Sequence, residues 1–169
     1  ILEEGIEQNP SAPAIHIQMG DIHKSASRHN DALKAYTKTV AVDPDFWTGH
    51  YKRGVALYYL SQLDASEVAL NEADKLNPSS PSVKHFKGLV ALAKNQTDQA
   101  LSFLTEASEM VRENADILFH LGQAYQRKSH WTEAQTQFEA AFRLNPRKSE
   151  VLYGLSQVSG KLDQRAEAR

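Results

Sequence analysis

Histidine is the residue type in this chain whose side chain most readily binds metals or carries protons near neutral pH. The 169 residues include seven: His16, His23, His29, His50, His85, His120 and His130. A zinc site needs three or four converging ligands, usually with thiolate or carboxylate company, and the chain has no cysteine. We therefore predict no metal site, and we interpret most of these imidazoles as half-buried residues that pack between helices.

Motifs for other chemistry are missing from the sequence. It contains no GxSxG nucleophile elbow, no HExxH zinc helix, no P-loop and no GxGxxG turn. Without cysteine there is also no disulfide and no thiol nucleophile. The sequence therefore predicts a chain that is not an enzyme, with no catalytic residue and no cofactor.

Charge and hydropathy narrow the class of partner. The net charge is −2 and the pI is near 6.4, whereas phosphate binding needs a clustered positive field. We therefore predict no nucleic-acid partner. No run of about 18 apolar residues and no basic-then-apolar leader occurs, so we expect no direct membrane contact and no signal peptide in this chain. The compartment stays open between cytoplasm and bacterial periplasm.

The elements that must position any site are set by an internal repeat. Four glycines lie 34 residues apart, and prolines and small polar residues keep the same period. The three series are Gly20, Gly54, Gly88 and Gly122; Pro10, Pro44, Pro78 and Pro146, with Arg112 in the one vacant proline position; and Ser27, Ser61, Asn95 and Ser129. Glycine inside a helix costs about 1 kcal/mol against alanine, so its recurrence predicts helices packed too closely for a side chain.

Apolar residues between these marks follow a helical period, as in Leu118, Leu121 and Tyr125. One unit therefore reads as a helix of about 14 residues, a tight turn, a second such helix and another turn. The prolines follow the ends of the second helices. We interpret Ser61 and Asn95, each three residues before an aspartate, as N-caps that begin them.

These residues resemble the tetratricopeptide repeat, a 34-residue helix pair with fixed packing positions. The copy with most matches reads Leu118, Leu121-Gly122, Tyr125, Ala134, Phe138, Ala141 and Pro146. The resemblance implies an all-α fold, an α-solenoid of antiparallel helix pairs in a right-handed superhelix with about 10–11 helices. It also places His16, His23 and His50 at packing positions.

The period divides the chain into units. We expect the end of a preceding repeat's second helix at 1–12, four full units at 13–46, 47–80, 81–114 and 115–148, and a partial fifth unit at 149–169. The fifth is expected to contain a first helix and the opening of its partner. Neither end has a polar capping helix, so we interpret the chain as part of a longer array.

In this family the first helices line a concave groove, and the resemblance implies which residues face it. We select as the partner-binding groove Ile17, Asp21, Tyr51, Lys52, Val55, Tyr58, Tyr59, His85, Phe86, Leu89, Phe119, His120, Gln123, Arg127 and Tyr153. The implied positions also include Gln126, Glu150 and Gln157. At His85 and His120 a pH-sensitive contact is an alternative to plain packing.

Aromatic residues dominate the middle of this implied groove and are typical of binding hot spots. We predict a non-catalytic scaffold that binds a protein or peptide partner there. Two alternatives stay open: the groove or the chain ends drive self-association, or the rings only pack on one another. One subtype of the family binds a C-terminal carboxylate through lysine and asparagine. Here Ile17, Asp21, Lys52, Ser82 and Phe86 hold those positions, which argues against such a receptor.

Overall fold

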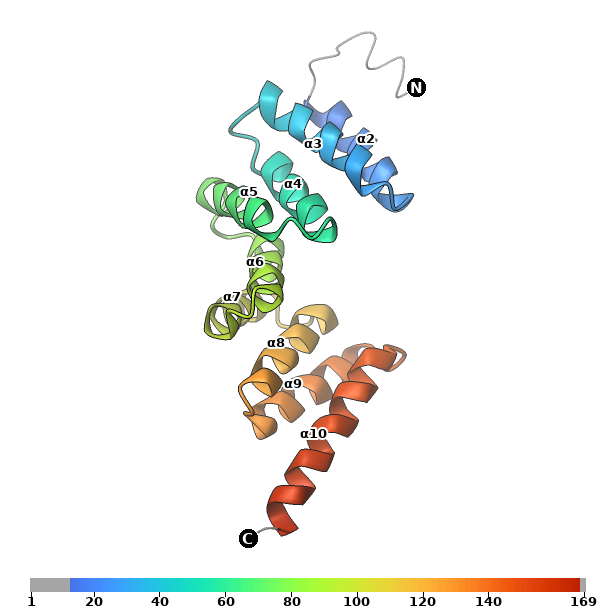
Figure 1. The fold of residues 1–169 in the computed structure, drawn as a ribbon, viewed down its shortest axis with the longest axis vertical. Coiled ribbons are helices and arrows are strands. Elements are labelled where there is room, and N and C mark those ends of the chain that lie inside the picture. Colours follow the sequence, from blue (N-terminus) through green and yellow to red (C-terminus); the bar gives the residue numbers. More distant parts are fainter. Residues whose placement is uncertain (1–12, 168–169) are drawn as a thin grey trace. The chain divides into compact units, whose positions relative to one another are not determined.

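A computed structural model describes residues 13–167, and this part is all-helical, with no strand (Figure 1). The helices are α2 (Pro13–Ser25), α3 (His29–Val42), α4 (Trp47–Tyr59), α5 (Leu63–Leu76), α6 (Pro81–Ala93), α7 (Thr97–Met110), α8 (Ala115–Arg127), α9 (Trp131–Leu144) and α10 (Ser149–Glu167). The predicted all-α class is confirmed. The helix end expected at 1–12 lies outside the described residues.

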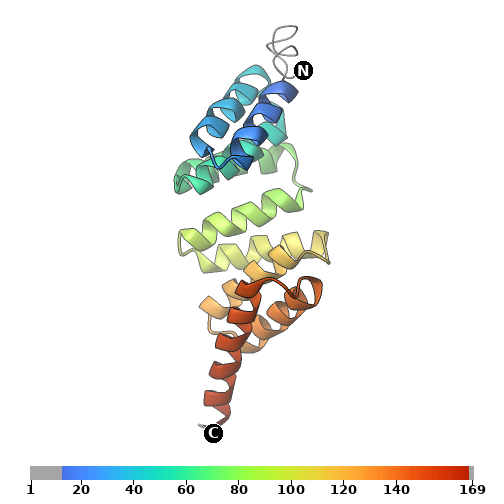
Figure 2. The same cartoon turned by 90° about the vertical axis from the view of Figure 1, so that its right-hand side faces the viewer.

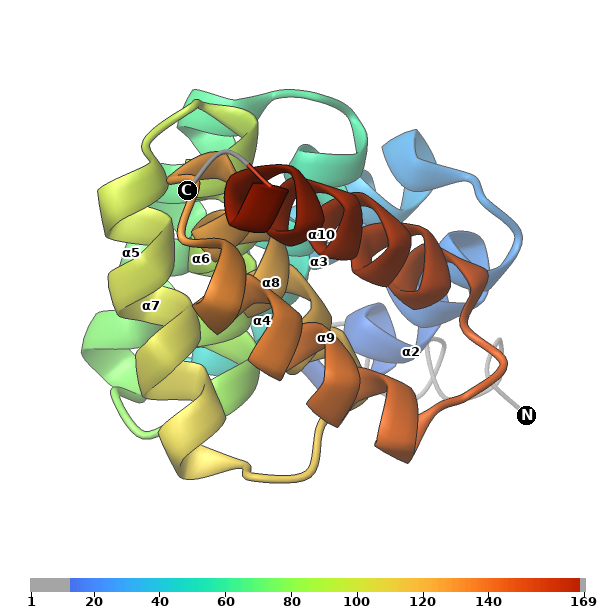
Figure 3. The same cartoon turned by 90° about the horizontal axis from the view of Figure 1, so that it is seen from below.

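The chain divides into two compact units, one ending at Phe86 and the other beginning at Lys87, within α6. In unit 1, α3 packs against both α2 and α4, and α4 packs against α5 (Figure 2). In unit 2, α8 packs against α7 and α9, and α10 packs against α9 and α8 (Figure 3). Each unit is therefore a stack of consecutive helices with its core between them.

The repeated glycines lie where two helices touch, as the period predicts. A methyl group on Gly20 would lie 2.2 Å from Cε1 of Tyr36, and one on Gly122 would lie 2.7 Å from the ring of Phe138. Both rings are fully buried. The alanines of the repeat are also fully buried, and where Ser66 replaces one, its hydroxyl donates to the Gly54 carbonyl at 2.7 Å. The core is thus built from the predicted packing positions.

The prediction that Ser61 and Asn95 are N-caps is wrong. Both have a left-handed backbone, with φ of 59° and 62°, and they follow the end of the first helix. The amide of Ser61 donates to the Tyr58 carbonyl, and the next amide, Gln62, donates to Leu57. This is the Schellman pattern of a helix C-terminus. Serine and asparagine tolerate this backbone less well than glycine, yet the same geometry recurs in all four turns.

The last helix also differs from expectation, because α10 runs unbroken from Ser149 to Glu167. The expected turn falls at Asp163, where the earlier turns have serine or asparagine. Residues 161–167 are mostly good helix formers, and Leu162 packs against the core cluster of unit 2. Nothing therefore interrupts the helix, and the opening of a partner helix is not formed within the described residues.

Candidate functional site

In unit 1 a charged triad joins α2, α3 and α4. The Lys52 ammonium donates to both carboxylate oxygens of Asp21, at 2.7 and 2.8 Å, and the Tyr36 hydroxyl donates to one of them at 2.7 Å. Burial raises the pKa of Asp21, but the hydrogen bonds from Lys52 and Tyr36 outweigh it and lower the pKa below its usual value. The triad is therefore satisfied internally.

Aromatic rings in unit 1 form a chain of contacts beside this triad. Phe86 meets Tyr51 and Tyr58 edge to face, with centroids 5.8 and 6.0 Å apart, and Tyr58 meets Tyr59 at 5.5 Å. Tyr59 stacks on His29 at 5.1 Å and is 52% exposed. The other three rings are half-buried against one another. The rings of this aromatic chain therefore pack on one another, as one expectation held. They also leave exposed surface at Tyr59, which a partner-binding role would need.

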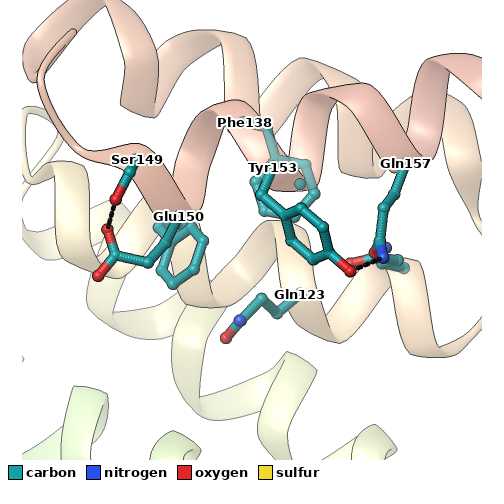
Figure 4. Close-up of a pocket in the computed structure, with 9 residues that line it drawn as sticks. Gln123, Phe138, Ser149, Glu150, Tyr153 and Gln157 are labelled. Atoms are coloured by element: carbon teal, nitrogen blue, oxygen red, sulfur yellow. Dashed lines mark hydrogen bonds between the residues drawn. The ribbon is translucent and has the colours of Figure 1, made fainter.

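Unit 2 contains a cavity of about 510 Å³ between α8 and α10, beside Phe138 of α9 (Figure 4). This volume is within the usual range for ligand sites, about 300–1,000 Å³. Its lining consists of two phenylalanines, three glutamines, one tyrosine, and a serine, a glutamate and a glycine of α10. They are Phe119, Gln123, Gln126, Phe138, Ser149, Glu150, Tyr153, Gly154 and Gln157. We call this the unit 2 pocket.

The polar groups of the pocket keep much of their hydrogen-bonding capacity. Gln126 donates to Gln157 at 2.8 Å, and Gln157 donates to the Tyr153 hydroxyl at 2.6 Å (Figure 4). The Tyr153 proton, one N–H of each of these amides and the whole Gln123 amide have no partner among the described residues. Tyr153 is 67% exposed. The wall therefore offers both donors and acceptors to a ligand.

Glu150 is the only charged side chain that lines the pocket. Its one side-chain hydrogen bond within residues 13–167 is from the Ser149 hydroxyl at 3.3 Å, and it makes no ion pair there. The neighbouring Lys148 does not pair with Glu150. Its ammonium forms an ion pair with Asp116 and lies 4.6 Å from the centre of the Phe119 ring. The Asp116–Lys148 pair is neutral as a whole, so the pocket has an excess negative charge.

His120 is not a group that titrates near neutral pH. Burial, together with the Lys148 ammonium, lowers its pKa to about 4, against an opposing effect of Asp116. The alternative of a near-neutral pH-sensitive contact therefore fails at this residue. The packing interpretation holds for His16 and His50, which are 9% and 8% exposed, and His50 also contacts the Pro44 carbonyl at 2.8 Å.

The predicted groove residues fall into three groups. Val55 and Leu89 are buried, at 3% and 8% exposure, so they offer a ligand almost no surface. Arg127 uses its guanidinium on the Leu92 carbonyl, and Ile17 packs against the Tyr36 cluster. The rest belong to the triad, the aromatic chain or the pocket and its rim: Asp21, Lys52, Tyr51, Tyr58, Tyr59, His85, Phe86, Phe119, His120, Gln123 and Tyr153.

Three pocket residues were outside the sequence prediction. Phe138 was assigned to the core only, and Ser149 and Gly154 carried no signal. Gly154 was detectable in principle, because glycine in a helix interior indicates close approach, and here a methyl group would lie 2.9 Å from the Phe138 ring. The described part of the chain shows no cluster of side chains suited to a metal ion. Nor does any of its helices have the length and hydropathy needed to cross a membrane.

Stacked helix pairs of this kind define a class, the helical-repeat scaffold proteins. Tetratricopeptide repeat models match residues 17–81 and 91–151. The chain belongs to the tetratricopeptide repeat family. Proteins of this family generally mediate protein–protein interactions and serve as scaffolds for assembly.

Three comparisons illustrate the breadth of the family. The chain is 22% identical to anaphase-promoting complex subunit 3 of Schizosaccharomyces pombe, over 88% of this chain and 22% of that protein. It is 27% identical to human protein O-mannosyl-transferase TMTC3, over 95% of this chain and 20% of that protein. It therefore spans about a fifth of these relatives. The crystal structure of YrrB, a repeat protein with an unusual peptide-binding site, superposes with a TM-score of 0.78 at 20% identity, covering 97% and 84% of the two chains, which confirms the solenoid fold.

Proposed function

We propose that this chain is a non-catalytic scaffold that binds a peptide segment of a partner protein on the faces of its first helices. The observation that carries the proposal is the unit 2 pocket, where amide groups with unused hydrogen-bonding capacity stand beside Phe119. Such a mixture of apolar floor and a few polar groups is typical of ligand sites. The aromatic chain of unit 1, with Tyr59 half exposed, supplies a second contact surface.

The test is selection of unstructured 12-residue peptides from a displayed random library, followed by titration of the selected peptides into labelled protein. We expect NMR shift changes at Gln123, Tyr153 and Gln157, and an affinity loss of at least tenfold in the variant Tyr153→Ala/Gln157→Ala. Both side chains are exposed, so the helical CD signal should stay unchanged. Glu139→Gln, an exposed change on α9, is the control. Selected peptides whose shifts avoid both the pocket and the aromatic chain would refute the proposal.

Self-association is a second candidate, because α10 exposes two large apolar side chains, Leu152 at 48% and Tyr153 at 67%. It predicts a mass that rises with concentration in light scattering and returns to the monomer value in Leu152→Gln. A constant monomer mass up to millimolar concentration would exclude it. A change at Leu152 leaves the pocket lining intact, so this experiment separates the two candidates.

A further inference from the structure

The unit 2 pocket corresponds, position by position, to the charged triad of unit 1. Gln123, Phe138 and Gly154 each lie 102 residues, or three repeats, after Asp21, Tyr36 and Lys52. All three line the pocket. The position that carries a lysine in unit 1 therefore carries a glycine in unit 2, the Phe138 ring packs directly against this glycine, and the pocket lies beside it.

In unit 1 these three repeat positions together hold a side-chain cation. The Lys52 ammonium reaches the Asp21 carboxylate at 2.7 Å and lies 6.0 Å from the centre of the Tyr36 ring. Its side chain is only 23% exposed. A cation held between a carboxylate and an aromatic ring is stabilised by both groups. In unit 2 the equivalent ring is Phe138, which is fully buried and packs on Gly154, and the Phe119 ring at the same pocket is already contacted by the Lys148 ammonium. A cation in this pocket therefore depends on its polar and charged groups.

The negative charge is also present in unit 2, although from a different position. Gln123 replaces Asp21, but Glu150 lines the pocket and makes no ion pair within the described residues. The nearby Lys148 is neutralised by Asp116. An incoming cation therefore meets an uncompensated carboxylate, together with the Gln123 amide oxygen.

The amide-rich wall indicates the conformation of the segment that carries this cation. A helix satisfies its own backbone groups, whereas an extended chain leaves N–H and C=O groups to be bound. Gln123, Gln126, Gln157 and Tyr153 present free donors and acceptors along α8 and α10 (Figure 4). This surface matches an extended backbone.

We propose that the unit 2 pocket binds an extended peptide segment through an arginine or lysine side chain, which enters the pocket beside Gly154 and pairs with Glu150. The inference rests on the proposed function, because it assigns the ligand chemistry of the same pocket. It specifies a preference for positive charge, the opposite of a site for a terminal carboxylate.

The experiment is a positional-scanning library of acetylated and amidated hexapeptides, bound to the 169-residue chain. We expect arginine and lysine to be preferred at one position and aspartate and glutamate to be disfavoured there. Glu150→Gln should weaken the cationic peptides about fivefold, the scale of a partly exposed ion pair, with less effect at 0.5 M NaCl. Gln123→Asp, which restores the carboxylate of the triad, should strengthen them by a similar factor.

Matched measurements separate the possible failures. Glu139→Gln removes an exposed carboxylate outside the pocket and should leave the preference unchanged. If peptides bind the pocket but neutral and cationic ones bind equally, and Glu150→Gln changes neither, the inference is overturned and the proposed function stands. If peptides with an acidic residue are preferred, the inference is also overturned. If no hexapeptide shifts any pocket resonance, the inference fails, and the 12-residue library then decides the proposed function on its own.

Discussion

The triad of unit 1 and the unit 2 pocket use the same three positions of the repeat. They differ in whether the polar groups at these positions are paired within the chain. In unit 1 the carboxylate of Asp21 is held by Lys52 and Tyr36. In unit 2 the corresponding Gln123 has no partner among the described residues, and the lysine position holds Gly154, against which the Phe138 ring packs. The comparison teaches that the same repeat positions can hold an internally satisfied ion pair in one unit and line a pocket in another.

The glycines that face the central rings should give the largest difference between the units. A methyl group at Gly20 would lie 2.2 Å from the Tyr36 ring, whose hydroxyl is fixed on Asp21, whereas one at Gly154 would lie 2.9 Å from Phe138. We expect Gly20→Ala to destabilise unit 1 by about 3 kcal/mol and Gly154→Ala to destabilise unit 2 by about 1–2 kcal/mol.

The two tryptophans allow this comparison to be measured unit by unit. Trp47 lies in unit 1 and Trp131 in unit 2, so urea unfolding followed by fluorescence in a Trp131→Phe or a Trp47→Phe background reports one unit at a time. Equal losses of unfolding free energy for the two alanine variants would show that the fixed Tyr36 hydroxyl does not make unit 1 less adaptable.

Acid should reduce the stability of unit 2 more than that of unit 1. The residue responsible is His120, which occupies the repeat position of Lys52. His120 lies 68 residues, or two repeats, after Lys52, and burial beside Lys148 lowers its pKa to about 4. The unfolded chain, with a histidine pKa near 6.5, binds the extra proton first, so stability is lost as the pH falls from about 6.5 to 4. The full loss is about 3 kcal/mol, from 1.36 kcal/mol per pKa unit.

Urea unfolding between pH 7 and pH 4 checks this expectation. His120→Gln should flatten the decline in unit 2, and His130→Gln, at a histidine whose side chain is 49% exposed, serves as the control. A decline of the same slope in the His120→Gln and His130→Gln variants would show that other groups cause the acid sensitivity.

Whether a contact could be predicted from the sequence depends on whether it lies within one repeat or between adjacent repeats. The 34-residue period correctly predicted that Gly20 and Gly122 lie against another helix, because each repeated residue reports one local contact. The Asp21–Lys52 pair has no such signature, since it depends on how adjacent first helices align. Unit 2 posed the same difficulty, because only the alignment of α8 with α10 shows that Gln123 and Glu150 share a pocket.

The turns show a different limit of sequence reasoning. Serine and asparagine are favoured as helix N-caps and are also compatible with a left-handed backbone at a helix C-terminus. The sequence at Ser61 fits both, and only the hydrogen bonds from Ser61 and Gln62 to the preceding helix decide between them. The unbroken α10 shows a related limit, because Asp163 keeps the period of the earlier turns and yet the helix continues through it to Glu167.

The ion pair of unit 1 should contribute less than either effect above. Lys52→Met keeps the aliphatic stem and removes the charge, which leaves Asp21 with the Tyr36 hydrogen bond alone. The Asp21 side chain is 43% exposed, so solvent screening limits the expected loss to about 1 kcal/mol. The lowered pKa of Asp21 should rise in the variant, and NMR titration of the Asp21 carboxyl carbon measures it. Unchanged titration would mean that Lys52 does not hold the carboxylate.

The smallest expected effect is a gain in stability at Gly160, in the C-terminal half of α10. A methyl group on Gly160 would meet nothing within 4 Å, in contrast to Gly154 one and a half turns earlier in the same helix. Gly160→Ala should therefore stabilise unit 2 by about 0.5 kcal/mol, part of the usual helix-propensity difference, since the end of a helix frays. Chemical denaturation followed at Trp131 tests the sign. A destabilising result would mean that this stretch of α10 does contact another surface, and that its glycine, like Gly154, is required by close packing.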